Sequence, residues 1–348
     1  MSDTSRICPD CEGTEELGRR DFLKVGATTA GGLLLGTTAA QAAPTPKSKS
    51  ETLVKKLYES MTDTQKKSVC FKWDHVAKGR GLLRTHVSNN WQITKPQIRG
   101  NFFTKDQQEI MRAIFEGLFN PAWVKKFDKQ LRDDTGGKAW GAGQSIAIFG
   151  EPGKGNFELV MTGRHMTVRA DGNSEKHVAL GGPIFHGHAA QGFNEKPDHP
   201  GNIFWHQALE ANKVYKMLDG KQRKLALERR RPGESSVAFR GKKGEFPGIP
   251  VSELSKDQVG ALEKVLMSLV EPYRKEDKAE VLASLKAQGG LDACSLAFYR
   301  DGDLGDDGVW DNWRLEGPAF VWYFRGAPHV HIWINVASDP SVKLNARG

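Results

Sequence analysis

The sequence predicts an α+β fold, in which an antiparallel sheet packs against helices and helical segments are inserted between the strands. Three observations support this prediction. Apolar residues recur at helical spacing in two separated parts of the chain. Short β-branched and aromatic runs separated by turns fall in two blocks, roughly residues 143–185 and 291–336. Because the helical segments lie between these blocks, we expect a single domain over residues 51–348 with a sheet that is discontinuous in sequence.

The first 42 residues have the features of an export signal. Arg19 and Arg20 are followed by a Phe-Leu-Lys run and by a weakly apolar stretch, residues 25–39, that is too short for a membrane span. Residues 40–42 supply an A-x-A cleavage pattern, so we place cleavage before Ala43. This pattern is typical of the twin-arginine signal, although an ordinary amphipathic helix is the alternative. It predicts the twin-arginine export machinery as a partner and a periplasmic or extracellular location.

The charge balance constrains the partners of the mature chain. The full chain carries a net charge of +8, and removing a signal with four basic and six acidic residues leaves +10. Such a balance permits binding to anionic glycans or phosphorylated surfaces. The expected ligand is a small molecule or a glycan. The basic stretch at residues 221–243 has few aromatic residues for base stacking, which argues against nucleic acid. We also expect no stable membrane span, a linker at residues 43–50 and no internal repeat. Cys70 and Cys294 could pair or remain buried thiols.

Helices are predicted in order along the chain. The first covers residues 53–61, and the next runs over 104–132, with Thr104 and Gln107 as a capping box and a restart at Pro121. Further helices are expected over residues 204–218, after Ser255, and from Pro272 to the glycine pair at 289–290.

Strands are predicted by runs with a period of two. In the first block these are residues 145–149, 157–161, 165–169 and 177–184, the last ending in a His-Gly-His sequence. In the second block they are residues 293–300, 320–324 and 330–336.

The last predicted strand carries the residues on which the functional prediction depends. Alternation places His329, His331, Trp333 and Asn335 on one face, while the intervening Val and Ile residues face a core. Two imidazoles at positions i and i+2 of a strand project side by side. This geometry suits two ligands of one transition metal.

Two further histidines fall at strand ends or turns of the predicted sheet, His165 and His188. We predict that the imidazole nitrogens of His165, His329 and His331 converge within about 4–5 Å, with His188 as a fourth ligand. Zinc, copper or iron would suit such a donor set. At least two of the outer ring nitrogens should have hydrogen-bond partners. The alternative is that these are ordinary loop residues and an aromatic sheet surface.

Two sequence blocks resemble a known family. The runs F-E-L-V-M-T-G-R-H-M-T-V-R-A and G-G-P-I-F-H-G-H, and the closing R-L-E-G-P-A-F-V-W-Y-F-R with its H-x-H, resemble the domain of unknown function 3500. The similarity covers most of the mature chain. Where that family often has two adjacent histidines, this chain has Arg164 and His165, so only His165 carries over. The resemblance implies an architecture and candidate residues, but no reaction.

Two classes of function remain open from the sequence. One is an exported metalloenzyme, hydrolytic or oxidative, with Glu316 or Glu158 as general base and Arg164 or Arg325 holding an anionic substrate. The other is a periplasmic or surface binding protein with an aromatic platform for a sugar or another flat ligand. That platform would consist of Trp313, Trp322 and Trp333. A serine hydrolase is disfavoured because no G-x-S-x-G motif is present.

Overall fold

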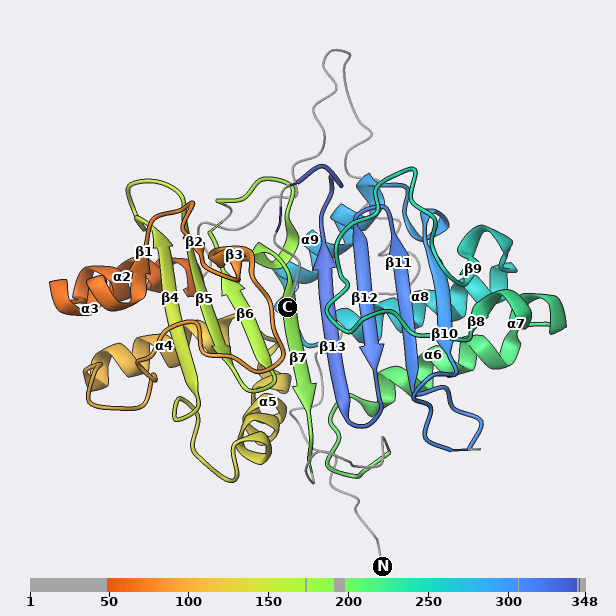
Figure 1. The fold of residues 1–348 in the computed structure, drawn as a ribbon, viewed down its shortest axis with the longest axis horizontal. Helices are drawn as coiled ribbons and strands as arrows, with labels where there is room; N and C mark the ends of the chain where they lie inside the picture. Colours follow the sequence, from red (N-terminus) through yellow and green to blue (C-terminus); the bar gives the residue numbers. More distant parts are fainter. Residues whose placement is uncertain (1–48, 173, 191–197, 306, 343, 345–348) are drawn as a thin grey trace, which may run out of the picture. The chain divides into compact units, whose positions relative to one another are not determined.

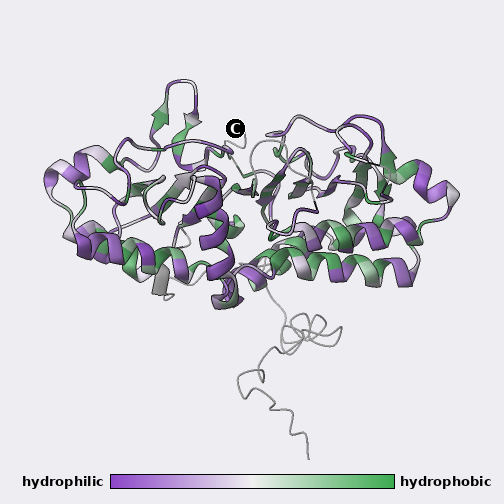
Figure 2. Cartoon of the chain, turned by 90° about the horizontal axis from the view of Figure 1, so that it is seen from below, coloured by the Kyte–Doolittle hydropathy of each residue, from purple (hydrophilic) through white to green (hydrophobic). Residues whose placement is uncertain are grey.

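The computed structural model describes residues 49–172, 174–190, 198–305, 307–342 and 344, so the predicted signal and most of the linker lie outside the described residues. Its main layer is one mixed sheet of 11 strands. Helices pack along one face of the sheet, and long connecting segments cross the other face (Figure 1 and Figure 2). The fold is therefore α+β, as the sequence predicts.

The elements follow one another in this order. The helices are α2 (Lys49–Ser60), α3 (Asp63–Val69), α4 (Lys105–Gly117), α5 (Pro121–Asp134), α6 (Trp205–Met217), α7 (Gly220–Ala226), α8 (Lys256–Val270) and α9 (Lys275–Ala287). The strands are β1 (Cys70–Phe71), β2 (Val76–Ala77), β3 (Gly81–Leu82), β4 (Gln144–Gly150), β5 (Phe157–Gly163), β6 (Met166–Ala170), β7 (Ile184–His188), β8 (Leu227–Glu228), β9 (Ile249–Pro250), β10 (Ser295–Tyr299), β11 (Asn312–Gly317), β12 (Phe320–Arg325) and β13 (Val330–Val336).

The sheet has the strand order β1-β4-β5-β6-β7-β13-β12-β11-β10-β8, and β9 pairs with β10. The eight central strands are antiparallel, whereas β1 and β8 pair in parallel with β4 and β10. Strands β7 and β13, far apart in sequence, lie side by side in the middle (Figure 1). In the part of the chain that is described, no helix is both long and apolar enough to span a membrane.

The sheet consists of two similarly built halves. Each half is a four-stranded meander, β4–β7 or β10–β13, with a short parallel strand at its outer edge, and each is preceded by a helix pair in the same order. The halves meet at two antiparallel contacts. Ile184 pairs with Ile334 in the β7–β13 contact, and Phe119 bridges Tyr273 between the helices. Corresponding residues therefore face each other across an approximate two-fold axis.

The expectation of no internal repeat is thus wrong at the level of structure. A short sequence similarity accompanies the repeat: Thr-Lys-Asp-Gln at residues 104–107 recurs as Ser-Lys-Asp-Gln at 255–258. Both form capping boxes, at the starts of α4 and α8, and the one at Thr104 and Gln107 was predicted. Each capping glutamine also bonds a glutamine of a neighbouring capping box, Gln107 with Gln65 and Gln258 with Gln222. In both halves, these glutamine–glutamine hydrogen bonds satisfy side-chain amides at corresponding positions.

One predicted strand is corrected by the structure. Residues 177–184 do not form a strand, and residues Ala179–Gly181 form a 3₁₀ turn before β7 begins at Ile184. Leu180, Gly181 and Gly182 have φ angles of 59°, 73° and 138°, which lie outside the strand region. The His-Gly-His sequence consequently belongs to β7 itself and not to a loop after it.

The sheet is buried on both faces. The main apolar cluster lies between the sheet and the helices and includes Ile332 and Ile334. A smaller cluster on the opposite face includes Phe185, Tyr323 and Trp333. Side chains of β13 alternate between the two faces of the sheet. Because both faces are covered, β13 is buried along its whole length.

Cys70 and Cys294 are free thiols in opposite halves of the sheet. Cys70 lies in the edge strand β1 and Cys294 directly precedes β10, eight strand steps away in the sheet order. At a strand spacing of about 4.8 Å this separation is roughly 38 Å, far beyond the reach of a disulfide. Burial raises the pKa of Cys70 to about 11 and that of Cys294 to about 12, so both thiols are unreactive at neutral pH.

Candidate metal centre

Three histidines converge at one end of the central strands. His165 occupies the tight turn between β5 and β6, while His329 directly precedes β13 and His331 is the second residue of that strand. Strand β7 runs between these segments, with Met166 opposite His186 and His331 opposite Gly187. Because antiparallel neighbours alternate in direction, the β5–β6 turn and the start of β13 reach the same end of the sheet.

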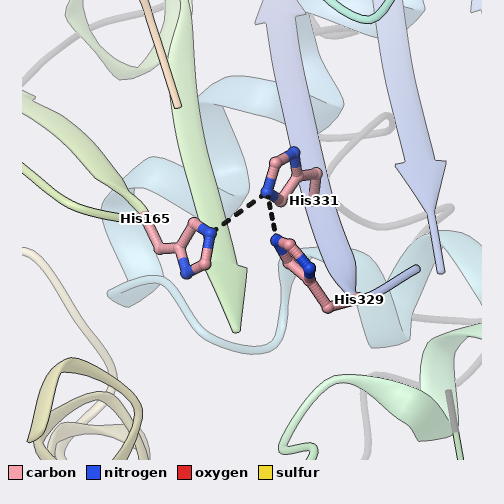
Figure 3. A group of neighbouring side chains, drawn as sticks. All are labelled: His165, His329 and His331. Carbon is pink, nitrogen blue, oxygen red and sulfur yellow. Dashed lines mark hydrogen bonds between the residues drawn. The ribbon is translucent and has the colours of Figure 1, made fainter. Parts of the chain in front are cut away.

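The ring nitrogens point toward one another (Figure 3). Nε2 of His331 lies 2.9 Å from Nε2 of His329 and 3.1 Å from Nε2 of His165. One ligand nitrogen from each ring lies within 4.8 Å of the others, and the three residues are only 3–4% exposed. The predicted convergence of His165, His329 and His331 is therefore confirmed.

The backbone of His165 is held in an unusual conformation. Its φ of 57° lies in the left-handed region, which disfavours residues with a side chain. Its N–H donates to the carbonyl of Asn89, and its carbonyl accepts from the N–H of Gly187 and from Nε2 of Gln130. These three hydrogen bonds fix the ring's starting point, at a cost in backbone strain of about 1–3 kcal/mol.

Gly187 makes room for the His165 ring. A Cβ at this position would lie 2.8 Å from the Val330 carbonyl oxygen and 3.0 Å from the His165 ring carbons Cγ and Cδ2. Gly187 faces the same side of the sheet as His331, its partner in the register. The missing side chain thus lets a histidine from the neighbouring turn lie beside His331.

Carboxylates lie against the outer nitrogens of two rings. Nδ1 of His165 lies 2.9 Å from Oδ1 of Asp134, although off the direction of a straight hydrogen bond. Nδ1 of His331 hydrogen-bonds to Oε1 of Glu234. The expectation of hydrogen-bond partners on at least two outer nitrogens is met for His331, whereas Nδ1 of His165 has a carboxylate beside it but no hydrogen bond within the described part of the chain. Such carboxylate–histidine pairs are the usual outer shell of a metal-bound imidazole.

The hydrogen bond to Glu234 sets the tautomer of His331. A carboxylate accepts hydrogen bonds, so Nδ1 of His331 carries the proton in the neutral ring. Nε2 of His331 then presents a lone pair toward Nε2 of His165 at 3.1 Å and toward Nε2 of His329 at 2.9 Å. A metal ion bound by the three Nε2 atoms would accept this lone pair.

The electrostatic environment shifts the pKa values of His331 and Asp134 in the directions that favour metal binding. Burial lowers the pKa of His331 well below its ordinary value, and electrostatic interaction with Arg325, His165, His329 and Arg164 lowers it further. Burial alone would raise the pKa of Asp134, but contact with His165 holds that pKa below its usual value. The site thus combines a neutral imidazole with an ionised carboxylate, the forms that metal binding needs.

His188, predicted as a fourth ligand, is not in this group. It pairs with Val330 in the register and so lies on the opposite face of the sheet from His331. Its Nε2 lies 3.1 Å from Oδ2 of Asp133. Within the described ranges, the group that could hold a metal consists of His165, His329 and His331.

The two predicted general bases lie elsewhere. Glu316 is 2.8 Å from a guanidinium nitrogen of Arg314 and 2.9 Å from one of Arg240. Glu158 is 2.8 Å from Arg169, and burial raises its pKa to about 8 despite that positive charge. Both carboxylates form ion pairs with arginines of the sheet region, and neither contacts the three histidines.

The two predicted arginines do lie beside the histidines. Nη2 of Arg325 donates to the His329 carbonyl at 3.1 Å, and its Nη1 lies 3.1 Å from Glu234. Arg325 therefore positions a ligand segment. Arg164 is half-buried and has no carboxylate partner in the part of the chain that the structure describes. Its charge acts on His331, so it is the better placed of the two to meet an anionic substrate.

The three tryptophans do not form one platform. Trp313 and Trp322 belong to the main core on the helix side, whereas Trp333 belongs to the cluster on the opposite face. All three are at most 2% exposed. A platform would need them on one accessible face, and alternation along β11, β12 and β13 prevents this.

Three residues of the site were not predicted from the sequence: Asp134, Glu234 and Gly187. Asp134 ends α5, where the helix dipole disfavours a negative charge, and this was a usable signal. Glu234 interrupts a stretch of basic residues, but nothing in the sequence shows that this stretch crosses β13. Gly187 reads as an ordinary spacer until the register places it opposite His331.

The corresponding positions in the other half of the fold carry other residues. The turn residues 163–166 correspond to 317–320, so Ala319 takes the place of His165. Gln288 takes the place of Asp134 and bonds the backbone of Ala319 and Ala337. Gln288 thus has a structural role, since its amide hydrogen-bonds to backbone groups. Because this half folds without histidines at these positions, the repeated fold does not require them.

Comparison with known proteins gives one match. The family described as Protein of unknown function (DUF3500) matches residues 43–334. No curated protein and no solved structure matches the chain.

Proposed function

The chain belongs to this DUF3500 family, whose description names no reaction. We propose, from the geometry of the three histidines and from the N-terminal sequence, that it is an exported, histidine-ligated metalloenzyme. Its ligands would be His165, His329 and His331, and its metal zinc, copper or iron. The reaction would be hydrolytic or oxidative.

The observation that carries the proposal is the set of facing Nε2 atoms. A structural role for three buried histidines would be expected to pair each Nε2 with an acceptor or a water. Here Nε2 of His331 lies near two other Nε2 atoms, while its Nδ1 and that of His165 lie against carboxylates. This arrangement supports a cation at the centre of the group.

The donor set supports catalysis more than a structural site. Three protein ligands leave a position for water or substrate, whereas structural zinc sites have four. A metal there would act as a Lewis acid or as a redox centre. Arg164 would hold an anionic group of the substrate, because its guanidinium is half-buried beside the site and unpaired within the described residues.

The proposal is tested on full-length protein purified from its natural host. Elemental analysis should give about one transition metal per chain. After replacement by Co²⁺, azide should change the visible spectrum, because an open coordination position binds an added anion. A metal-free protein that takes up no Co²⁺ would contradict the metal centre. A bound metal whose spectrum azide leaves unchanged would contradict the catalytic role.

Export is proposed from the sequence, since the signal lies outside the described residues. Changing both Arg19 and Arg20 to Lys should leave unprocessed precursor in the cytoplasm, because the export receptor distinguishes guanidinium from ammonium. Fractionation with mass measurement of the chain reports the result. Normal processing of the double variant would refute a twin-arginine signal, and because the exchange keeps both positive charges, a loss of export would not be an effect of net charge.

A further inference from the structure

Arginine side chains line a cavity at the outer edge of the second half of the sheet, β10–β13. A cavity of 560 Å³ is lined by Leu227, Arg229, Arg230, Arg300 and Asp301. Strands β8 and β10 run in parallel there, so the residues that follow them leave the sheet at the same end. The N–H of Arg300 donates to the Glu228 carbonyl at 3.0 Å, which fixes the two segments against each other.

The positive charges in this cavity are not neutralised by the chain. Asp301 is the one carboxylate among the lining residues, and it lies 3.7 Å from Nε of Arg231 outside the cavity. Arg229, Arg230 and Arg300 have no ion-pair partner in the described ranges of the chain. Three guanidinium groups around one hollow repel one another and create a positive potential that attracts anions.

The other half of the fold provides an internal control. Cys70 and Phe71 pair with β4 as Leu227 and Glu228 pair with β10. The positions that correspond to Arg229, Arg230 and Arg300 are therefore occupied by Lys72, Trp73 and Gly150. Because the same backbone forms without arginines at this edge, the fold does not explain their presence.

We propose that this cavity binds a multivalent oxyanion group, a phosphate or a sulfate, free or as an ester. Guanidinium groups present paired N–H donors that match the oxygens of such groups. A volume of 560 Å³ falls in the range of small-molecule sites and exceeds the needs of a single ion. This site is separate from the histidines and does not depend on the proposed metal.

The test is calorimetric titration of the full chain with pyrophosphate at constant ionic strength. We expect saturable binding with one equivalent per chain. Arg230→Gln combined with Arg300→Gln should weaken it at least tenfold, because each guanidinium contributes charge-assisted hydrogen bonds. Lys242→Gln with Lys243→Gln removes two charges of the same basic stretch outside the cavity and should leave the affinity unchanged. The variant residues are exposed, so circular dichroism should show an intact fold.

The His331→Ala protein completes the experiment, since a bound metal would also attract pyrophosphate. Its pyrophosphate affinity should equal that of the unchanged chain. Absence of saturable binding would overturn the proposal, as would an equal loss in the lysine and arginine variants. Titrations with inorganic phosphate and with a phosphomonoester distinguish the two sources: tighter binding of the monoester identifies an esterified ligand, and tighter binding of phosphate the free ion.

Discussion

Changing His331 to Ala should abolish metal binding by the full chain while leaving its fold intact. His331 is the central ligand, since its Nε2 lies within 3.1 Å of both other Nε2 atoms. Loss of an outer-shell partner alone typically costs 10–100-fold in metal affinity, so loss of this ligand should cost more than about 100-fold. The apolar residues Val330 and Ile332 that anchor β13 in the core are not altered.

The measurement is metal content after equilibration with Zn²⁺ and gel filtration, with circular dichroism as the check on folding. His206→Ala is the matched control, because His206 has the same side chain but lies outside the three-histidine group. If His331→Ala retained one metal per chain, the proposed centre would be wrong. A parallel loss in the control would mean that the metal binds histidines nonspecifically.

The sequence predicts the local features of this protein better than its long-range ones. The capping boxes of α4 and α8 and the face of His329 and His331 follow from spacings of two to four residues. Such spacings are fixed by helix and strand geometry. The convergence of His165 with them was predicted as a hypothesis that required a particular strand pairing. The structure supplies that pairing through β7, which lies between segments more than 150 residues apart.

The errors have a common physical cause. His188 was predicted as a fourth ligand, but its pairing with Val330 puts it on the opposite face of the sheet from His331. Glu316 was predicted as a general base, but its pairing with Val321, the partner of Asn335, puts it near the far end of β13. Facing and register are decided by tertiary packing, which a single sequence does not reveal. The outer-shell carboxylates come from a helix end and a crossing segment, and these are positioned only in the folded chain.

The second large effect is expected at Gly187, a residue that has no ligand atom. Changing Gly187 to Ala should weaken metal binding about tenfold or more, because the new Cβ would lie 3.0 Å from the His165 ring and 2.8 Å from the Val330 carbonyl. The carbonyl belongs to the sheet and cannot move far, so the ring must shift away from His331. Overpacking of this kind costs typically 1–3 kcal/mol, and part of that cost falls on stability.

Metal competition with a chromophoric chelator measures the affinity, and thermal unfolding measures the stability. Gly260→Ala is the control, because no atom lies within 4 Å of its added Cβ in helix α8. That change should leave metal affinity unchanged and stabilise the fold by about 0.5–1 kcal/mol. The decisive comparison uses residual metal binding in His165→Ala, with and without Gly187→Ala. If the glycine acts by making room for the ring, its effect on affinity should disappear once the ring is gone. A full additional loss in the double variant would show that Gly187 acts on β13 through the Val330 carbonyl instead.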